Sequence, residues 1–216
     1  PQFGAKLHSH EARFGGKWPF SDVSGIRGSV SYRNDRLTIL ATDFNSLSIP
    51  NDYLNWVSGR LEYVFDNTLP TGLNLYNGSR GKIFGEYYKQ ADVSQSGMVV
   101  LGLDFRHYQK IHREIIWANR IAGSTSFGEE KLIYYLGATD NWIVPDFNNS
   151  TPIDFSQNYY FQALATNLRG FNQNIRNGNT FALINSEVRI PLFRYLLNRP
   201  IKSDFIRNFQ IAGFGD

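Results

Sequence analysis

The sequence predicts an all-β protein, an antiparallel transmembrane β-barrel present as a partial, open barrel of about ten strands. Three observations predict it. Apolar and polar residues alternate along nearly every segment, helical periodicity never persists, and 15% of the 216 residues are aromatic although the mean hydropathy is −0.35. A soluble all-β sandwich or barrel shares this composition and is the first alternative.

Alternation is clearest over 57–66, whose polar face carries Arg60 and Glu62. The same pattern places Asp104 and Arg106 on the polar face of a later segment. A sheet in water needs an apolar cover for its apolar face, and the sequence suggests no helix or wholly apolar strand to supply one. Lipid supplies that cover in a membrane barrel, and strands of about 9–11 residues cross a bilayer when tilted. We therefore favour the membrane barrel.

Turn-forming residues separate the predicted strands. They are Asn34-Asp35, Asn77-Gly78, Ser96-Gly97 and Asn198-Arg199-Pro200. We predict strands over 24–33, 36–43, 56–66, 80–90, 97–108, 112–123, 131–138, 158–166, 180–192 and 205–216, with less certain strand material before residue 18. Residues 138–158 are expected to form a long external loop. We expect one domain over 1–216 that is truncated at both ends, with its first and last strands unpaired.

Composition and motifs exclude several classes of protein. No apolar run approaches the roughly 18 residues of a transmembrane helix. The net charge is +3 and the basic residues are scattered, so we exclude nucleic acid as a partner. His8 and His10 share a strand face, but two ligands without a third are weak evidence for a metal. We predict no metal and no cofactor. Nucleophile elbows, phosphate-binding loops and dinucleotide fingerprints are absent, so we predict no enzyme.

One arginine has predicted partners. Alternation along 180–192 points Glu187 inward, together with Asn185 and Arg189, and alternation along 205–216 points Asp216 inward. Arg169 lies in the loop before these strands, beside a glycine that allows a tight bend. If that loop folds back into the barrel, the guanidinium can bind both carboxylates. The alternative is an external arginine in water with two unrelated acids.

These residues resemble a known family. Leu168-Arg169-Gly170-Phe171 resembles the Arg-Gly-aromatic signature of the lumen-inserted loop of BamA/TamA-type outer-membrane assembly factors, a superfamily that includes bacterial surface antigen barrels. The resemblance extends over about residues 131–216 and includes Tyr135-Leu136-Gly137, Asn185-x-Glu187-x-Arg189-x-Pro191 and Phe214-x-Asp216. In that family the loop arginine contacts the acids of the two following strands. Residues 1–130 are consistent with the family only as barrel strands.

The resemblance implies a location and a function. It implies a protein of the Gram-negative bacterial outer membrane that inserts or exports polypeptides, with the lipid bilayer, polypeptide substrates and periplasmic modules as partners. A porin-like or solute-specific channel is the alternative, with Arg27, Arg60, Glu62, Asp104 and Arg106 as its lumen lining. An outer-membrane enzyme or a soluble ligand-binding barrel is the third possibility.

Overall fold

The computed structural model describes residues 5–40, 50–92, 96–139, 143–144, 146–154, 156–197 and 199–216. The protein is all-β, with one large sheet and one small sheet. Its elements are β1 (Ala5–Ser21), β2 (Ser24–Ile39), β3 (Asp52–Asp66), β4 (Leu69–Gly72), β5 (Leu75–Gln90), β6 (Gly97–His112), β7 (Ile115–Gly128), β8 (Lys131–Leu136), β9 (Tyr159–Leu164), β10 (Arg176–Gly178), β11 (Thr180–Ile190), α1 (Leu192–Leu196), α2 (Asp204–Asn208) and β12 (Ile211–Gly215).

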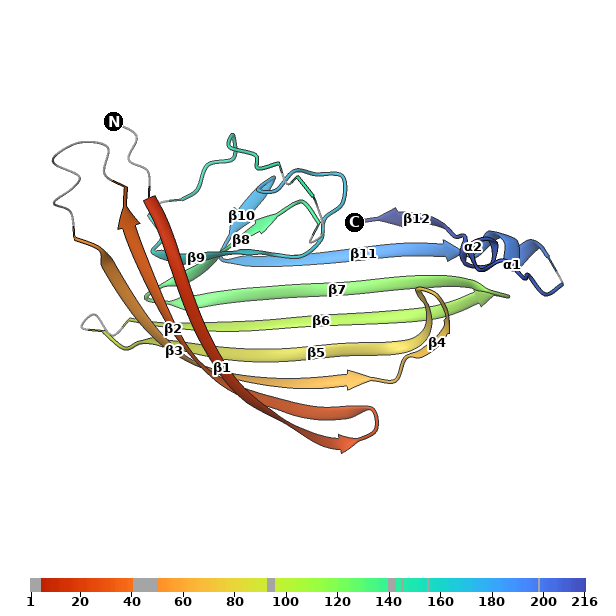
Figure 1. The fold of residues 1–216 in the computed structure, drawn as a ribbon, viewed down its shortest axis with the longest axis horizontal. Coiled ribbons are helices and arrows are strands. Elements are labelled where there is room, and N and C mark those ends of the chain that lie inside the picture. Colours follow the sequence, from red (N-terminus) through yellow and green to blue (C-terminus); the bar gives the residue numbers. More distant parts are fainter. Residues whose placement is uncertain are drawn as a thin grey trace.

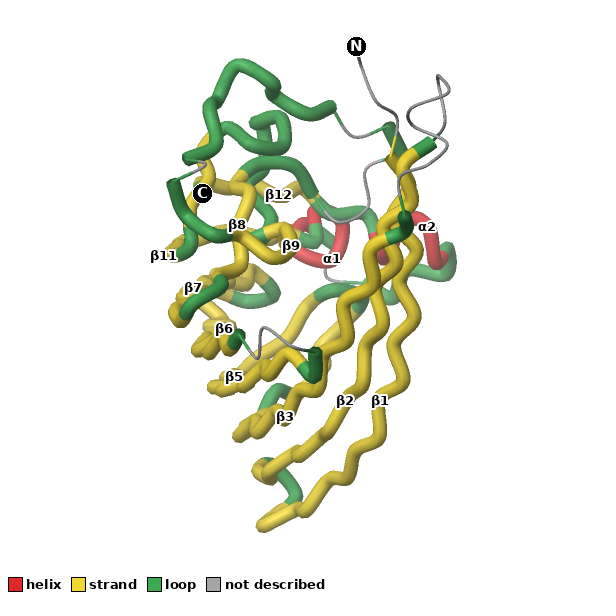
Figure 2. Tube along the Cα trace, turned by 90° about the vertical axis from the view of Figure 1, so that its left-hand side faces the viewer, coloured by secondary structure: helices red, strands yellow, loops and turns green. Residues whose placement is uncertain are grey.

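The large sheet is antiparallel and follows the chain in the order β1-β2-β3-β5-β6-β7-β11-β12, while the short β4 pairs with β5 at one end. Figure 1 shows β5, β6, β7 and β11 side by side, with β1 crossing the view at a steep angle. Figure 2 shows the sheet bent into a trough. Among the described residues, β1 pairs only with β2 and β12 only with β11, so both edges of the sheet are open.

The two faces of the large sheet differ as period-two alternation predicts. Leu61, Leu103 and Ile121 lie on the convex face with 61%, 43% and 50% of their surface exposed. On the concave face Ser58 and Glu62 are buried, and so are the apolar Met98 and Val100 of β6. The polar residues that alternate with exposed apolar residues therefore line the inside of the trough.

The small sheet fills part of the trough (Figure 2), and its strands were predicted to lie elsewhere. Segments 131–138 and 158–166 were predicted as wall strands, but β8 pairs in parallel with β9 and antiparallel with β10, apart from the large sheet. Four successive residues of β8 are buried: Leu132, Ile133, Tyr134 and Tyr135. A strand covered on both faces is apolar throughout. The expectation that no apolar strand remains to fill a core was wrong.

The core lies between the two sheets. Leu132 and Tyr134 of β8 pack with Met98 and Val100 of β6, and Phe181 of β11 adds an edge-to-face contact with Tyr134 at 5.0 Å between ring centres. A second cluster forms at the other end of the trough. There the β4–β5 hairpin brings Leu75 into a buried group with Tyr108, Ile116 and Ala118.

Two predicted turns were wrong. β2 continues through Asn34-Asp35, because these residues pair in register with His10 and Ser9 of β1, a strand that the sequence indicated only weakly. Residues 36–39 therefore belong to β2, and 41–43 lie outside the described residues. β5 likewise continues through Asn77-Gly78, and the hairpin turns at Asn74, whose φ is +56°. Ser96 directly precedes β6, which begins at Gly97, while Asn198 lies outside the described residues.

The last predicted strands are shorter than expected. β11 ends at Ile190 because Pro191 has no N–H to donate to a strand ladder, and α1 begins directly after it. The predicted strand 205–216 is divided between α2 and β12. Neither helix exceeds five residues, and in the described part of the chain no helix has the length and apolar character to cross a membrane.

Candidate functional site

The loop that carries Arg169 is a turn tied to the end of β8. Leu168 forms an antiparallel bridge with Ala138, and the Ala138 N–H donates to the Phe171 carbonyl at 2.8 Å. Gly170 has a φ of +84°, in the left-handed region where glycine avoids the strain of a side chain. The predicted tight bend is therefore at Gly170, and it presents Arg169 toward the large sheet.

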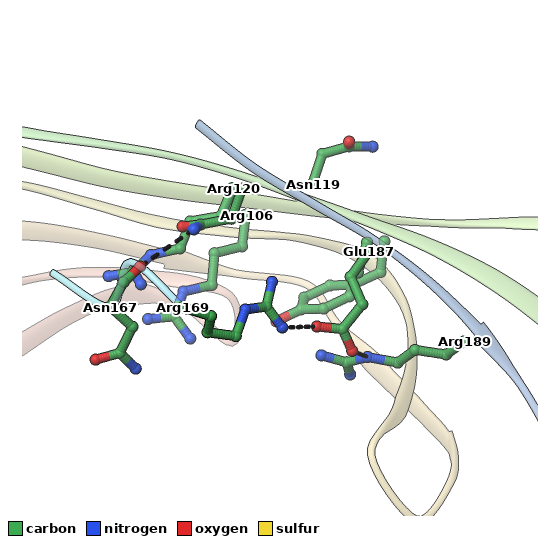
Figure 3. Close-up of a pocket in the computed structure, with 10 residues that line it drawn as sticks. Arg106, Asn119, Arg120, Asn167, Arg169, Glu187 and Arg189 are labelled. Carbon is green, nitrogen blue, oxygen red and sulfur yellow. Dashed lines mark hydrogen bonds and ion pairs between the residues drawn. The ribbon is translucent and has the colours of Figure 1, made fainter. Parts of the chain in front are cut away.

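The Arg169 side chain lies between two carboxylates (Figure 3 shows its contact with Glu187). Nη1 donates to Glu187 Oε2 at 2.7 Å, while Nη2 and Nε donate to the two carboxylate oxygens of Asp216 at 2.7 and 3.0 Å. The Arg169 backbone N–H also donates to Asp216 at 2.9 Å. The guanidinium carbon lies 3.8 Å from the centre of the Phe214 ring. One side chain thus links the loop to two neighbouring strands.

Strand register explains why these groups meet. β11 and β12 are antiparallel neighbours, and Glu187 lies directly opposite Phe214. Asp216 is two residues beyond Phe214 and shares its face by period-two alternation. The acid of β11, the ring of β12 and the acid after β12 therefore converge on one position of the concave face.

The Arg169 cluster is partly withdrawn from water. The Asp216 side chain is 3% exposed, and that of Arg169 is 28% exposed. The hydrogen bonds to Asp216, opposed by burial and reinforced by the hydrogen bond to Glu187, raise the pKa of Arg169 above its ordinary value. A bidentate guanidinium–carboxylate pair at this depth is stronger and more directional than an exposed pair.

Two other predicted residues extend this cluster. Arg189 donates to the second oxygen of Glu187 at 2.7 Å, as Figure 3 shows. Asn185 donates to the backbone carbonyl of Asn167, just before the loop, at 3.2 Å. Between loop and sheet lies a pocket of about 200 Å³, to which Arg106 and Arg120 also contribute.

Gly137 lets the loop pack closely. Its φ is +109°, and a Cβ atom at this position would lie 2.0 Å from the carbonyl oxygen of Asn172 and 2.8 Å from the carbonyl carbon. Both atoms are backbone atoms, so a side chain requires the chain just after Phe171 to move. The glycine of Tyr135-Leu136-Gly137 thus has a steric role in seating the loop.

We expect Gly137→Ala to lower the free energy of unfolding by about 2–4 kcal/mol, because it adds both strain and a backbone clash. The matched control is Gly178→Ala in β10, where the nearest atom to a Cβ is 3.8 Å away. Thermal unfolding of both variants checks this. Equal melting temperatures for the two variants would contradict the role of Gly137.

A second contact, absent from the sequence analysis, joins the small sheet to the far wall of the trough. The Tyr160 ring of β9 lies 4.2 Å from that of Trp56 in β3, and its hydroxyl donates to Asp35 of β2. Arg33 of β2 places its guanidinium 5.8 Å from the centre of the same ring. Residues 129–179 are therefore attached to both sides of the trough.

The remaining predicted residues form ion pairs on the concave face. Arg60 binds Glu62 at 2.9 Å, and Arg27 reaches Glu62 at 3.5 Å. Asp104 binds Arg106 at 3.0 Å. The wall pairs do not join the Arg169 cluster by hydrogen bonds among the described contacts, although Arg106 lines the pocket beside it.

The sequence did not single out two residues that form ion pairs with the predicted residues Arg60 and Asp104. Glu86 of β5 binds Arg60 at 3.0 Å, and Arg120 of β7 binds Asp104 at 2.7 Å. Both ion pairs follow from period-two alternation, which places the side chains on the concave face, together with the strand register. Glu86 lies directly opposite Arg60, and Arg120 lies on the strand next to that of Asp104.

No family model matches the sequence, and no curated protein matches it. The site is therefore interpreted from its geometry. Within the described ranges, no group of three or more His, Cys, Asp or Glu residues is arranged to hold a metal ion. The arrangement consists of guanidinium–carboxylate contacts, which position the loop on the large sheet.

Proposed function

We propose that the chain is a membrane-embedded segment of an outer-membrane β-barrel of the assembly or translocation type, similar to BamA/TamA-type factors, which inserts or exports polypeptides. The observation that carries the proposal is the Arg169 contact with Glu187 and Asp216 on the inside of a curved sheet. A charged loop tip held on the inner wall is the feature that the family resemblance implies. In this role the loop braces the barrel and needs no cofactor.

The convex face supports a membrane location. Aliphatic residues occupy its middle, including Leu61, Ile83, Leu101, Leu103 and Ile184. Exposed aromatic residues share this face, among them Trp18, Tyr63, Tyr87 and Trp117, and Tyr63 lies directly opposite Ile83. A sheet face that exposes this many apolar side chains suits contact with the acyl chains of a bilayer.

A charge on the convex face tests the membrane location. We expect Leu103→Arg to destabilise the folded protein in vesicles by about 2–4 kcal/mol, the cost of an arginine near the middle of the bilayer, and so to lower the folding yield. Val64→Arg is the matched control, because Val64 faces the trough at nearly the same level of the sheet. Folding yield of the full-length protein into lipid vesicles is the measurement. Equal yields for both variants, or a full yield without lipid, would reject the membrane location.

The assembly activity needs its own measurement. Vesicles that contain the full-length protein are expected to accelerate insertion of an unfolded outer-membrane β-barrel relative to empty vesicles. The matched comparison is an Arg169→Ala protein that itself still folds into the vesicles. Acceleration by neither protein would reject the assembly function.

A solute channel is the second candidate, and the mixed ion pairs of the concave face favour it. Steady conductance of the full-length protein in planar bilayers, unchanged when the Arg169 loop is released, would support the channel over the assembly factor.

A further inference from the structure

Basic residues predominate on the part of the concave face nearest the turn between β1 and β2. Two adjoining hollows of about 590 and 280 Å³ share Arg27, Glu62 and Lys82 as lining residues. Lys17 of β1 lines the first hollow and Arg80 of β5 lines the second. We call Lys17, Arg27, Arg80 and Lys82 the basic face.

The acids of this region neutralise the basic face only in part. Glu62 is already bound by Arg60, and Arg27 reaches it only at 3.5 Å. Asp66 lies directly opposite Arg80 but accepts its hydrogen bonds from Thr68, and Asp104 lies opposite Lys82 but binds Arg106 and Arg120. In the described part of the chain, no carboxylate oxygen lies within 4.0 Å of the charged nitrogens of Lys17, Arg80 or Lys82. Three cations therefore face the trough without an ion pair.

Strand register sets a like charge on one side of Arg27 and of Arg80, and an acid on the other. Lys17 lies directly opposite Arg27 and Arg106 directly opposite Arg80, while Glu62 lies opposite Arg27 and Asp66 opposite Arg80 on the remaining neighbour. Arg106 in turn lies opposite Arg120, and Asp104 binds both (Figure 3 shows the two arginines together). Like charges at directly opposed positions destabilise a sheet. A bound anion would relieve the repulsion between Lys17 and Arg27 and between Arg80 and Arg106.

We propose that the basic face binds acidic segments of polypeptides in extended conformation, an inference that rests on the proposed function and names its substrate class. The four cations come from β1, β2 and β5, with β3 between the last two, and neighbouring strands lie about 4.8 Å apart. Lys17 and Lys82 are exposed, and the Arg27 side chain is 52% exposed. Charges spread over an open surface match carboxylates spread along a chain, whereas a compact anion needs donors that converge in an enclosed site.

The experiment measures binding of fluorescent poly-L-glutamate to the full-length protein in detergent micelles. We expect Lys17→Gln/Lys82→Gln to weaken binding about tenfold, and added salt to weaken it further. The matched control is Lys89→Gln/Lys202→Gln, which removes the same charge. Lys89 lies on β5 with its side chain on the convex face, and Lys202 lies in the exposed segment before α2. This control is expected to bind like the unaltered protein.

Three results would overturn the proposal: equal binding by the Lys17/Lys82 variant and the unaltered protein, equal losses in both variants, or binding of inorganic pyrophosphate but not of poly-L-glutamate. The vesicle insertion assay separates this inference from the proposed function. A protein that accelerates insertion but does not bind poly-L-glutamate overturns the substrate class alone. A protein that binds poly-L-glutamate but does not accelerate insertion overturns the assembly function instead.

Discussion

Replacing Arg169 by alanine is expected to release the 168–171 turn from the sheet and to lower the free energy of unfolding by about 2–3 kcal/mol. The side chain of Asp216 is 3% exposed and would lose both hydrogen bonds from the guanidinium. Glu187 would keep only Arg189. The value lies below that of a fully buried pair because Arg169 is partly exposed. Thermal unfolding gives the stability, and proteinase K cleavage near residue 170 reports release of the turn.

Two variants make the Arg169 result specific. Arg169→Lys keeps the charge but loses the planar fork, so we expect a loss of intermediate size. Arg176→Ala removes the arginine that begins β10, whose described hydrogen bond is to the carbonyl of its neighbour Ile175, and should leave both measurements unchanged. If the Arg169→Ala protein had the stability and cleavage pattern of the Arg176→Ala protein, Arg169 would not hold the 168–171 turn on the sheet.

Replacing Asp104 by asparagine is the second large effect that we expect, with a loss of about 2–4 kcal/mol. The carboxylate binds Arg106 at 3.0 and 3.1 Å and Arg120 at 3.2 and 2.7 Å. These arginines lie directly opposite each other on β6 and β7. Asparagine keeps the shape but removes the only charge that separates them among their described ion pairs. Denaturant unfolding in detergent measures the loss.

A second substitution distinguishes repulsion from a lost shape. Adding Arg120→Gln to Asp104→Asn should recover part of the stability, because it removes one of the two like charges. Asp22→Asn, in the exposed turn between β1 and β2, is the control for loss of a carboxylate and should change little. A double variant less stable than Asp104→Asn alone would show that repulsion is not the cause.

The faces of the large sheet could be predicted from sequence because alternation is a local property. Leu61 and Glu62 are adjacent, and their opposite faces follow from the pleat alone. The ends of strands could not be predicted in the same way. Asn34-Asp35 is a good turn sequence, but its pairing with β1 outweighs that local preference. Such pairing depends on a strand that is distant in the chain.

The cluster around Arg169 was partly accessible from sequence. Glu187 and Asp216 follow from alternation, and the arginine follows from a short motif. The contact between Tyr160 and Trp56 could not be predicted, because it depends on where β9 crosses the trough. β8 had a readable signal in its unbroken apolar run from Leu132 to Leu136, which indicates a strand covered on both faces.

The chain order of the large sheet has a kinetic consequence. From β1 to β7 every pairing joins strands that are close in sequence, so these hairpins can form one after another with little loop-closure entropy. The pairing of β11 with β7 is different, because residues 129–179 lie between them. Those residues contain the small sheet that fills the trough. Strand addition during folding should therefore pause after β7, and packing of the small sheet should set the rate at which β11 joins.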